Sequence, residues 1–123
     1  MRLFVADDSS AIRERIVRML SDVPNSVVVG EASDGAETMR GIPVVKPDLV
    51  ILDLQMPKGN GIEILPQIKG LSPPPLVMVL TNYATSRHRS ACHDLGSDYF
   101  FDKSREFENA IGVIETLAST DVH

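Results

Sequence analysis

The stretch LVILDLQMPKGNG, residues 49–61, decides the fold and raises the question of function. Four apolar residues, 49–52, lead directly into Asp53, and one proline and two glycines follow by position 61. An apolar run without polar alternation predicts a strand covered on both faces, which is typical of a parallel sheet between two layers of helices. The carboxylate at its end is either a solvated residue at the rim of the sheet or a group held there for chemistry.

Composition and charge place the chain among ordinary globular domains. Its 123 residues are 43% hydrophobic and 24% charged, so one domain over residues 1–123 can bury a core without disulfides, and we expect no effector domain in this chain. A net charge of -5 argues against direct nucleic-acid binding. No signal peptide is evident and no apolar run approaches the about 18 residues of a membrane span. With the single Cys92, these features favour a cytoplasmic protein without a membrane partner.

Five short apolar runs, each followed by polar residues and a helix-like stretch, predict five β-α units. Right-handed crossovers then favour a doubly wound, flavodoxin-like α/β domain with a five-stranded parallel sheet in the order 2-1-3-4-5. In this order the first and third strands end side by side, where crevices form and ligands bind. The predicted strands are residues 2–6, 26–32, 49–53, 75–81 and 98–102.

Capping residues indicate where the first two helices begin. Ser9 or Ser10 follows the first strand and can accept an orphan amide hydrogen bond. Asp34 with Glu37, three positions on, forms a capping box for the second helix. That helix is expected to end near Pro43, because proline lacks the amide donor of a helix interior.

The last three helices differ in the strength of their signals. The third is expected to begin near Gly61, with Pro66 bending or delaying it, and the fifth has a clear apolar stripe and a cap at Ser104. The fourth is expected to be the loosest, because its inward candidates are mostly small: Ala84, Ala91, Cys92 and Leu95. It also carries a basic run that is either an output patch or a solvated face: Arg87, His88, Arg89 and His93.

Polar residues at the ends of four strands are the partners that Asp53 requires. Asp7 and Asp8 follow the first strand, Thr81 ends the fourth, and Lys103 follows the fifth, all at one edge of the sheet. Crowded carboxylates raise one another's pKa unless a cation lies among them, and hard oxygen ligands suit Mg²⁺. A carboxylate can then attack a phosphoryl group and form an acyl phosphate, while a hydroxyl and an ammonium bind its oxygens. Asp53, Thr81 and Lys103 fit these roles.

Four motifs resemble the receiver domains of two-component response regulators, of the single-domain chemotaxis type. They are ADD after the first strand, DLQMPKGNG, LTNYA and GSDYFFDK, and the likeness covers essentially the whole chain. The resemblance implies a phosphorelay in which a histidine kinase or histidine phosphotransfer protein phosphorylates Asp53. An unidentified output partner would then bind the surface of the fourth helix, fifth strand and fifth helix. A phosphorylation-dependent homodimer stays open.

The resemblance also implies a metal site and catalytic roles. Asp8, Asp53 and the backbone carbonyl of Gln55 would ligate Mg²⁺ or Mn²⁺, with Asp7 assisting through water. The domain would catalyse its own phosphorylation and dephosphorylation without being a conventional enzyme. Asp53 would be the nucleophile in that reaction.

Other residues would bind the phosphoryl group or control its lifetime. By the resemblance, Thr81 bonds a phosphoryl oxygen, Lys103 pairs with the phosphate, and Thr81 with Phe100 forms the switch. Gln55 and Tyr83 flank the path by which water attacks the acyl phosphate. Because a rigid ring excludes water and supplies no base, Tyr83 is expected to prolong the lifetime of the phosphoprotein.

Three positions depart from the family pattern. Ser104 stands where the family has proline, so a cis peptide after Lys103 is not expected, because without proline it costs about 3 kcal/mol. Asp102 occupies a position that is more often apolar, and the sequence offers no account of it. Phe100 lacks the hydroxyl group of many relatives, which leaves only ring packing to a switch at that position.

Two alternatives come from other functional classes. A Mg²⁺-dependent phosphohydrolase with an aspartate nucleophile places a D-x-D arrangement at the first strand, whereas Asp7 and Asp8 are adjacent and Ser9 follows. A receiver-like module that binds a cofactor such as flavin, or a partner, and is not phosphorylated would use the first β-α turn. That turn, DDSSA, is acidic and repels phosphate unless a metal intervenes.

Overall fold

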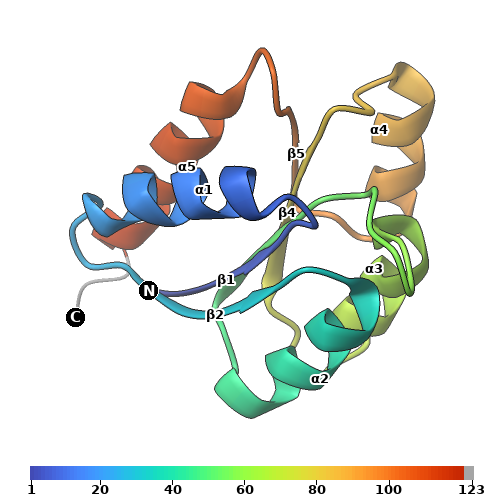
Figure 1. The fold of residues 1–123 in the computed structure, drawn as a ribbon, viewed down its shortest axis with the longest axis horizontal. Helices are drawn as coiled ribbons and strands as arrows, with labels where there is room; N and C mark the ends of the chain where they lie inside the picture. The colour runs from blue at the N-terminus through green and yellow to red at the C-terminus, as the bar shows by residue number, and fades with distance from the viewer. Residues whose placement is uncertain (121–123) are drawn as a thin grey trace.

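A computed structural model describes residues 1–120 as five strands that alternate with five helices. The strands are β1 (Arg2–Ala6), β2 (Val27–Ala32), β3 (Leu49–Leu52), β4 (Leu76–Thr81) and β5 (Tyr99–Asp102). The helices are α1 (Ser10–Ser21), α2 (Gly35–Val45), α3 (Gly61–Lys69), α4 (Ser86–Asp94) and α5 (Phe107–Thr120). Figure 1 shows α1 and α5 together on one face of the sheet and α2, α3 and α4 on the other.

The sheet is parallel and its strand order is β2-β1-β3-β4-β5, which confirms the predicted doubly wound fold. Backbone hydrogen bonds continue past the ends of three strands. The amide of Asp7 donates to Ala32 O at 3.0 Å, and the amide of Asp53 donates to Ala6 O at 3.0 Å. The amide of Lys103 donates to Thr81 O at 2.8 Å. These bonds fix the backbone of the acidic residues and the lysine at one edge of the sheet.

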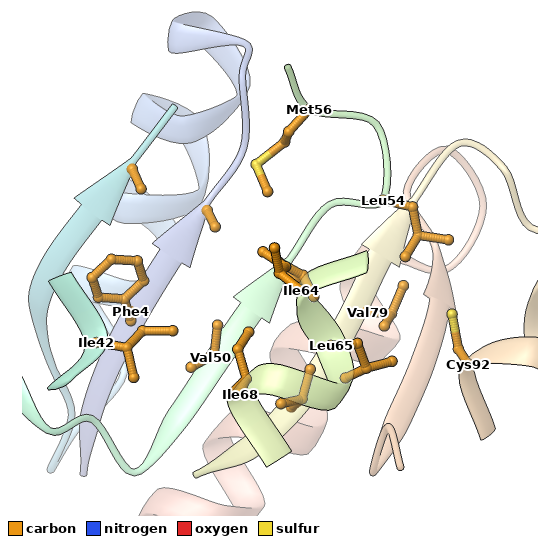
Figure 2. Packing of buried hydrophobic residues seen from close by; sticks show 14 residues of the cluster. Phe4, Ile42, Val50, Leu54, Met56, Ile64, Leu65, Ile68, Val79 and Cys92 are labelled. Carbon is orange, nitrogen blue, oxygen red and sulfur yellow. The ribbon is translucent and has the colours of Figure 1, made fainter. Parts of the chain in front are cut away.

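Two apolar clusters, one on each face of the sheet, form the core. Every residue of β3 is buried, because α1 and α5 cover one of its faces and α2 and α3 the other. Figure 2 shows the second of these layers, where Phe4 of β1 lies against Ile42 of α2 and Cys92 of α4 lies beyond Val79 of β4. The long apolar run before Asp53 therefore exists because its strand is central and covered twice.

The first two helices begin as predicted, but the second ends later. Asp34 accepts the amide hydrogen of Glu37 at 2.7 Å, and of the two candidate serines Ser9 caps α1. The expected end of α2 near Pro43 is wrong, since the helix continues to Val45. The side chain of Arg2 donates to the last carbonyls of the helix, so a contact distant in sequence stabilises the turn that proline weakens.

Helix α3 begins at Gly61 as predicted, and Pro66 lies inside it without delaying its start. Asn60 caps it by accepting the amide hydrogen of Glu63 at 3.0 Å. A Cβ atom on Gly61 would lie 2.7 Å from the carbonyl oxygen of Asp53, closer than real Cβ contacts allow. Glycine is therefore required here for the helix to start directly against the strand end that carries Asp53.

The expected places of Ala84 in α4 and of Ser104 at the cap of α5 are wrong. Ala84 precedes α4 and is not part of it, because Thr85 caps the helix. Within α4 Cys92 is the buried residue. Ser104 does not cap α5, which begins at Phe107, because the amide and hydroxyl of Ser104 both donate to Asp102 Oδ1, at 2.9 and 2.7 Å.

Among residues 1–120 no helix has the length and apolar character that a membrane span requires.

Candidate functional site

Three carboxylates meet where β1 and β3 end. One oxygen from each of Asp7, Asp8 and Asp53 lies within 4.8 Å of the others. Asp7 and Asp53 are buried, with 2% and 5% of their surface exposed, whereas Asp8 is exposed. The sequence prediction that these residues share one edge of the sheet therefore agrees with the geometry.

Lys103 reaches this cluster from the end of β5. Its Nζ donates to Asp7 Oδ2 at 2.7 Å and to Asp53 Oδ2 at 3.1 Å. Burial raises the pKa of Asp53 above its ordinary value of 3.8, the charge of Asp7 adds to this, and Lys103 opposes both. Burial alone would lower the pKa of Lys103, but its hydrogen bond to Asp7 and the two negative charges raise it above 10.5. The lysine is therefore firmly charged, while the charge of Asp53 is costly.

The donor set fits a hard divalent cation. The ammonium of Lys103 pairs with two of the three carboxylates, Asp7 and Asp53, so the cluster keeps an excess of negative charge. Oxygen ligands and an exposed Asp8, which leaves room for water molecules, are features of Mg²⁺ sites. The amide of Gln55 donates to Asp53 Oδ1 at 3.3 Å, which brings the backbone of Gln55 beside the same carboxylate.

The start of α2 contacts and supports the loop after β3. The amide of Gly35 donates to Pro57 O at 3.1 Å. A Cβ atom on Gly35 would lie 2.0 Å from the carbonyl oxygen of Gly59, so only glycine allows this approach of backbone to backbone. The loop that follows Asp53 therefore has a rigid support that the sequence analysis did not identify.

Thr81 is the last residue of β4, and Tyr83 lies on the loop that follows it. Thr81 is fully buried, and its Oγ1 accepts the amide hydrogen of Tyr83 at 3.2 Å. Tyr83 is 43% exposed, and its ring stacks on His88 with centroids 5.7 Å apart. The structure thus places Tyr83 between the end of β4 and the start of α4, while its shielding of Asp53 stays a prediction.

Phe100 is held by a residue that the sequence analysis did not assign to the site. Phe100 is partly buried against the core. The guanidinium carbon of Arg89 lies 4.8 Å from the centre of the Phe100 ring, and Nη1 of Arg89 donates to Phe100 O at 3.1 Å. Nη2 of the same side chain donates to Glu106 Oε1 at 2.6 Å. Arg89 therefore joins α4, β5 and the loop before α5.

A second arginine, Arg13, supports the acidic cluster from α1. Its Nη1 donates to the backbone carbonyl of Asp7 at 2.7 Å, and its Nε pairs with Glu31 Oε1 at 3.2 Å. Arg13 was not among the site residues predicted from the sequence. The available signal was an arginine near the start of the helix that follows the acidic pair Asp7 and Asp8.

Taken together, the fold and the acidic edge define a class of α/β signalling domains. The chain belongs to the response regulator receiver domain family, whose model matches residues 3–115. Among curated proteins, a protein-glutamate methylesterase/protein-glutamine glutaminase of Methanospirillum hungatei is 37% identical over 111 residues. The aligned part is 89% of this chain and 32% of that protein, so the chain spans about a third of the length of this relative.

Solved structures agree with this assignment. The response regulator domain of CheB from Thermotoga maritima has a TM-score of 0.84 at 25% identity, and the match covers 98% of this chain and 94% of that chain. The isolated REC domain of RcsB from Salmonella enterica serovar Typhimurium, solved in the presence of phosphomimetic BeF3⁻, has a TM-score of 0.84 at 26% identity. That match covers 94% of this chain and 88% of the other.

Proposed function

We propose that the chain is a phosphorylation-controlled switch in which Asp53 accepts a phosphoryl group from a histidine kinase or a histidine phosphotransfer protein. The observation that carries this proposal is the contact of the buried Asp53 carboxylate with Lys103 Nζ, 3.1 Å away, inside an acidic cluster. Membership of the receiver family supports it, because these domains serve phosphorylation-based signalling. The same membership favours this function over a phosphohydrolase or a flavin module.

The residues around Asp53 supply what phosphoryl transfer needs. A carboxylate oxygen of Asp53 forms the new bond to phosphorus, while the bond from phosphorus to the leaving group breaks. Lys103, which is charged and already beside that carboxylate, pairs with the oxygens of the transferred group. The hydroxyl of Thr81 leaves its position at the amide of Tyr83 to donate to a phosphoryl oxygen.

A divalent cation completes this site. Asp8, Asp53 and the carbonyl of Gln55 would hold Mg²⁺ or Mn²⁺, with Asp7 assisting through water. When bound, the cation offsets the negative charges of the carboxylates and of the phosphoryl group. Lys103 pairs with Asp7 and Asp53 and leaves the three-carboxylate cluster with an excess of negative charge, so the site without a cation repels an incoming phosphate.

The output of the switch is proposed to be a change in the surface of α4, β5 and α5. Movement of Thr81 toward the phosphoryl group vacates space beside β4, and Phe100 turns inward to fill it. Because the ring of Phe100 now contacts Arg89, this movement changes an exposed part of α4. A partner that binds this surface would distinguish the two states by differential affinity.

The test is to incubate the protein with acetyl phosphate, with Mg²⁺ or with excess chelator, and to locate added phosphate by mass spectrometry. We expect a single labelled residue, Asp53, and no label in chelator. Asp53→Asn should abolish the label. Asp94→Asn, a matched change at an exposed residue of α4, should leave it unchanged. Label that survives Asp53→Asn, or that forms equally in chelator, contradicts the proposal.

A further inference from the structure

The loop that carries Lys103 has no proline to restrict its backbone, and a set of hydrogen bonds restricts it instead. Asp102 Oδ1 accepts from the amide and hydroxyl of Ser104, at 2.9 and 2.7 Å. The backbone carbonyl of Asp102 accepts from the amide of Glu106 at 2.8 Å. Asp102, which the sequence left without an account, therefore closes the turn around Lys103.

Strand β5 is an edge strand, so half of its backbone groups point away from the sheet. In a parallel strand the amide and carbonyl of one residue point to the same side, and successive residues alternate. Because the amide of Lys103 donates inward to Thr81 O, Phe100 and Asp102 point outward. No strand among residues 1–120 pairs with this side of β5.

Two side chains occupy this open edge. Arg89 Nη1 donates to the outward carbonyl of Phe100 at 3.1 Å, and Glu106 Oε1 accepts the outward amide hydrogen of Asp102 at 3.0 Å. The two side chains are joined to each other by the bond of 2.6 Å from Arg89 Nη2 to Glu106 Oε1. They satisfy two of the outward backbone groups of β5, the carbonyl of Phe100 and the amide of Asp102, as a neighbouring strand would.

We infer that Arg89 and Glu106 are positioning residues, which fix the outer edge of β5 so that Lys103 is held against Asp53. This inference rests on the proposed function, since it assigns the pair a part in phosphoryl transfer. The path of contacts runs from Arg89 to Glu106, from Glu106 to the amide of Asp102, and from there to the next residue, Lys103. Helix α4 thereby acts on the rate of phosphorylation as well as on output.

The pair differs from an ordinary surface salt bridge in what its loss should change. Its side chains are 42% and 31% exposed, and a pair this exposed contributes little to the free energy of unfolding. Its removal should therefore leave the thermal midpoint nearly unchanged. The displacement of a catalytic group by a fraction of an ångström, in contrast, lowers a reaction rate strongly.

The experiment compares Arg89→Ala and Glu106→Ala with the unmodified protein. At saturating Mg²⁺ and acetyl phosphate, we expect the phosphorylation rate of Asp53 to fall about tenfold. The Mg²⁺ concentration for half-saturation should stay unchanged, because the proposed ligands lie on the loops after β1 and β3. Glu106→Gln keeps an acceptor for the Asp102 amide and should recover part of the rate. Arg40→Ala is the control, since Arg40 is an exposed residue of α2 whose side chain makes no ion pair or hydrogen bond within the described chain.

Amide resonances give a readout that does not depend on phosphorylation. In Glu106→Ala, the amide of Asp102 should exchange with solvent faster and the resonance of Lys103 should shift. Unchanged amides, or an unchanged phosphorylation rate in both alanine variants, overturn the inference. If the unmodified protein is not phosphorylated at all, the proposed function fails instead, and the two failures are thereby distinguished.

Discussion

The ammonium group of Lys103 lies 3.1 Å from the carboxylate of Asp53, a residue 50 positions earlier in the chain. It lies closer still, 2.7 Å, to Asp7. Two buried carboxylates therefore share one ammonium group, which does not fully compensate the negative charges of both. This arrangement makes the charge of Asp53 costly for the folded protein, and the proposed transfer of a phosphoryl group to Asp53 can be measured separately from that cost.

Asp53→Asn is expected to raise the thermal midpoint of the metal-free protein at neutral pH by a few degrees. The pKa of Asp53 is raised in the folded state, chiefly by burial, so its contribution to stability is present below pH 3.8 and is lost as pH rises through the raised pKa. The advantage of the asparagine variant should therefore shrink as pH falls toward 3.8. Circular dichroism melts between neutral and acidic pH measure this. An equal or lower midpoint at neutral pH contradicts it.

Mg²⁺ is expected to stabilise the folded protein, because a ligand that binds only the folded state adds about 2.7 kcal/mol at a hundred times its dissociation constant. Asp8→Asn should abolish most of the Mg²⁺-dependent rise in thermal midpoint. It should change the metal-free midpoint little, because Asp8 is exposed. Potassium chloride at matched ionic strength is the control. A shift of the same size in Asp8→Asn would place the cation elsewhere.

Cys92 is expected to react slowly with iodoacetamide at pH 8 while the protein is folded. Its thiol is fully buried, and burial raises its pKa from 9.0 to about 11, so the reactive thiolate is scarce. Because this is the only cysteine of the chain, its alkylation rate reports the opening of α4. The rate should increase at least a hundredfold in denaturant. Rapid alkylation of the folded protein would mean that α4 does not cover the thiol.

Beryllofluoride with Mg²⁺ is expected to change amide hydrogen exchange mainly at residues 81–101. Helix α4 has one fully buried residue, Cys92, and elements with few buried contacts open at low free energy. The loop after β3, in contrast, is held against the start of α2 through Gly35. Exchange measured by mass spectrometry with and without beryllofluoride tests this. Changes confined to α2 and α3 would refute it.

Tyr83→Ala is expected to speed the loss of phosphate from Asp53 several-fold in the presence of Mg²⁺. The ring beside the loop after β4 is proposed to exclude the attacking water, and its stacking on His88 limits its movement. Tyr83→Phe keeps the ring and should behave as the unmodified protein. Gln55→Ala serves as the comparison at the other flanking position. A decay rate that is unchanged or slower in Tyr83→Ala shows that the ring does not shield the site.

The fold could be predicted from the sequence because its signals are local. The apolar runs that become β3 and β4 lack alternation, which requires cover on both faces and hence a doubly wound sheet. The candidate site followed from the same order, since Asp7, Asp53 and Lys103 each follow a strand and parallel strands end at one edge. No contact between side chains had to be known.

The errors arose where a specific side-chain contact, distant or close in sequence, outweighs the simple capping and proline rules. The second helix passes Pro43 because Arg2 binds its last carbonyls across more than 40 positions. Ser104 does not cap α5 because the carboxylate of Asp102 takes both its amide and its hydroxyl. The bond from Arg89, in α4, to Glu106, just before α5, joins residues 17 positions apart. No spacing rule for a single helix or strand predicts such a bond.

The two side chains at the outer edge of β5 also affect how the molecule meets its neighbours. An edge strand with free backbone groups is a template on which a strand of another molecule can pair. Here the outward carbonyl of Phe100 and the outward amide of Asp102 are already bonded to Arg89 and Glu106. Strand β5 is also short, four residues long. The same contacts that hold the lysine loop thus occupy part of this edge, which disfavours its extension by a strand of a second molecule.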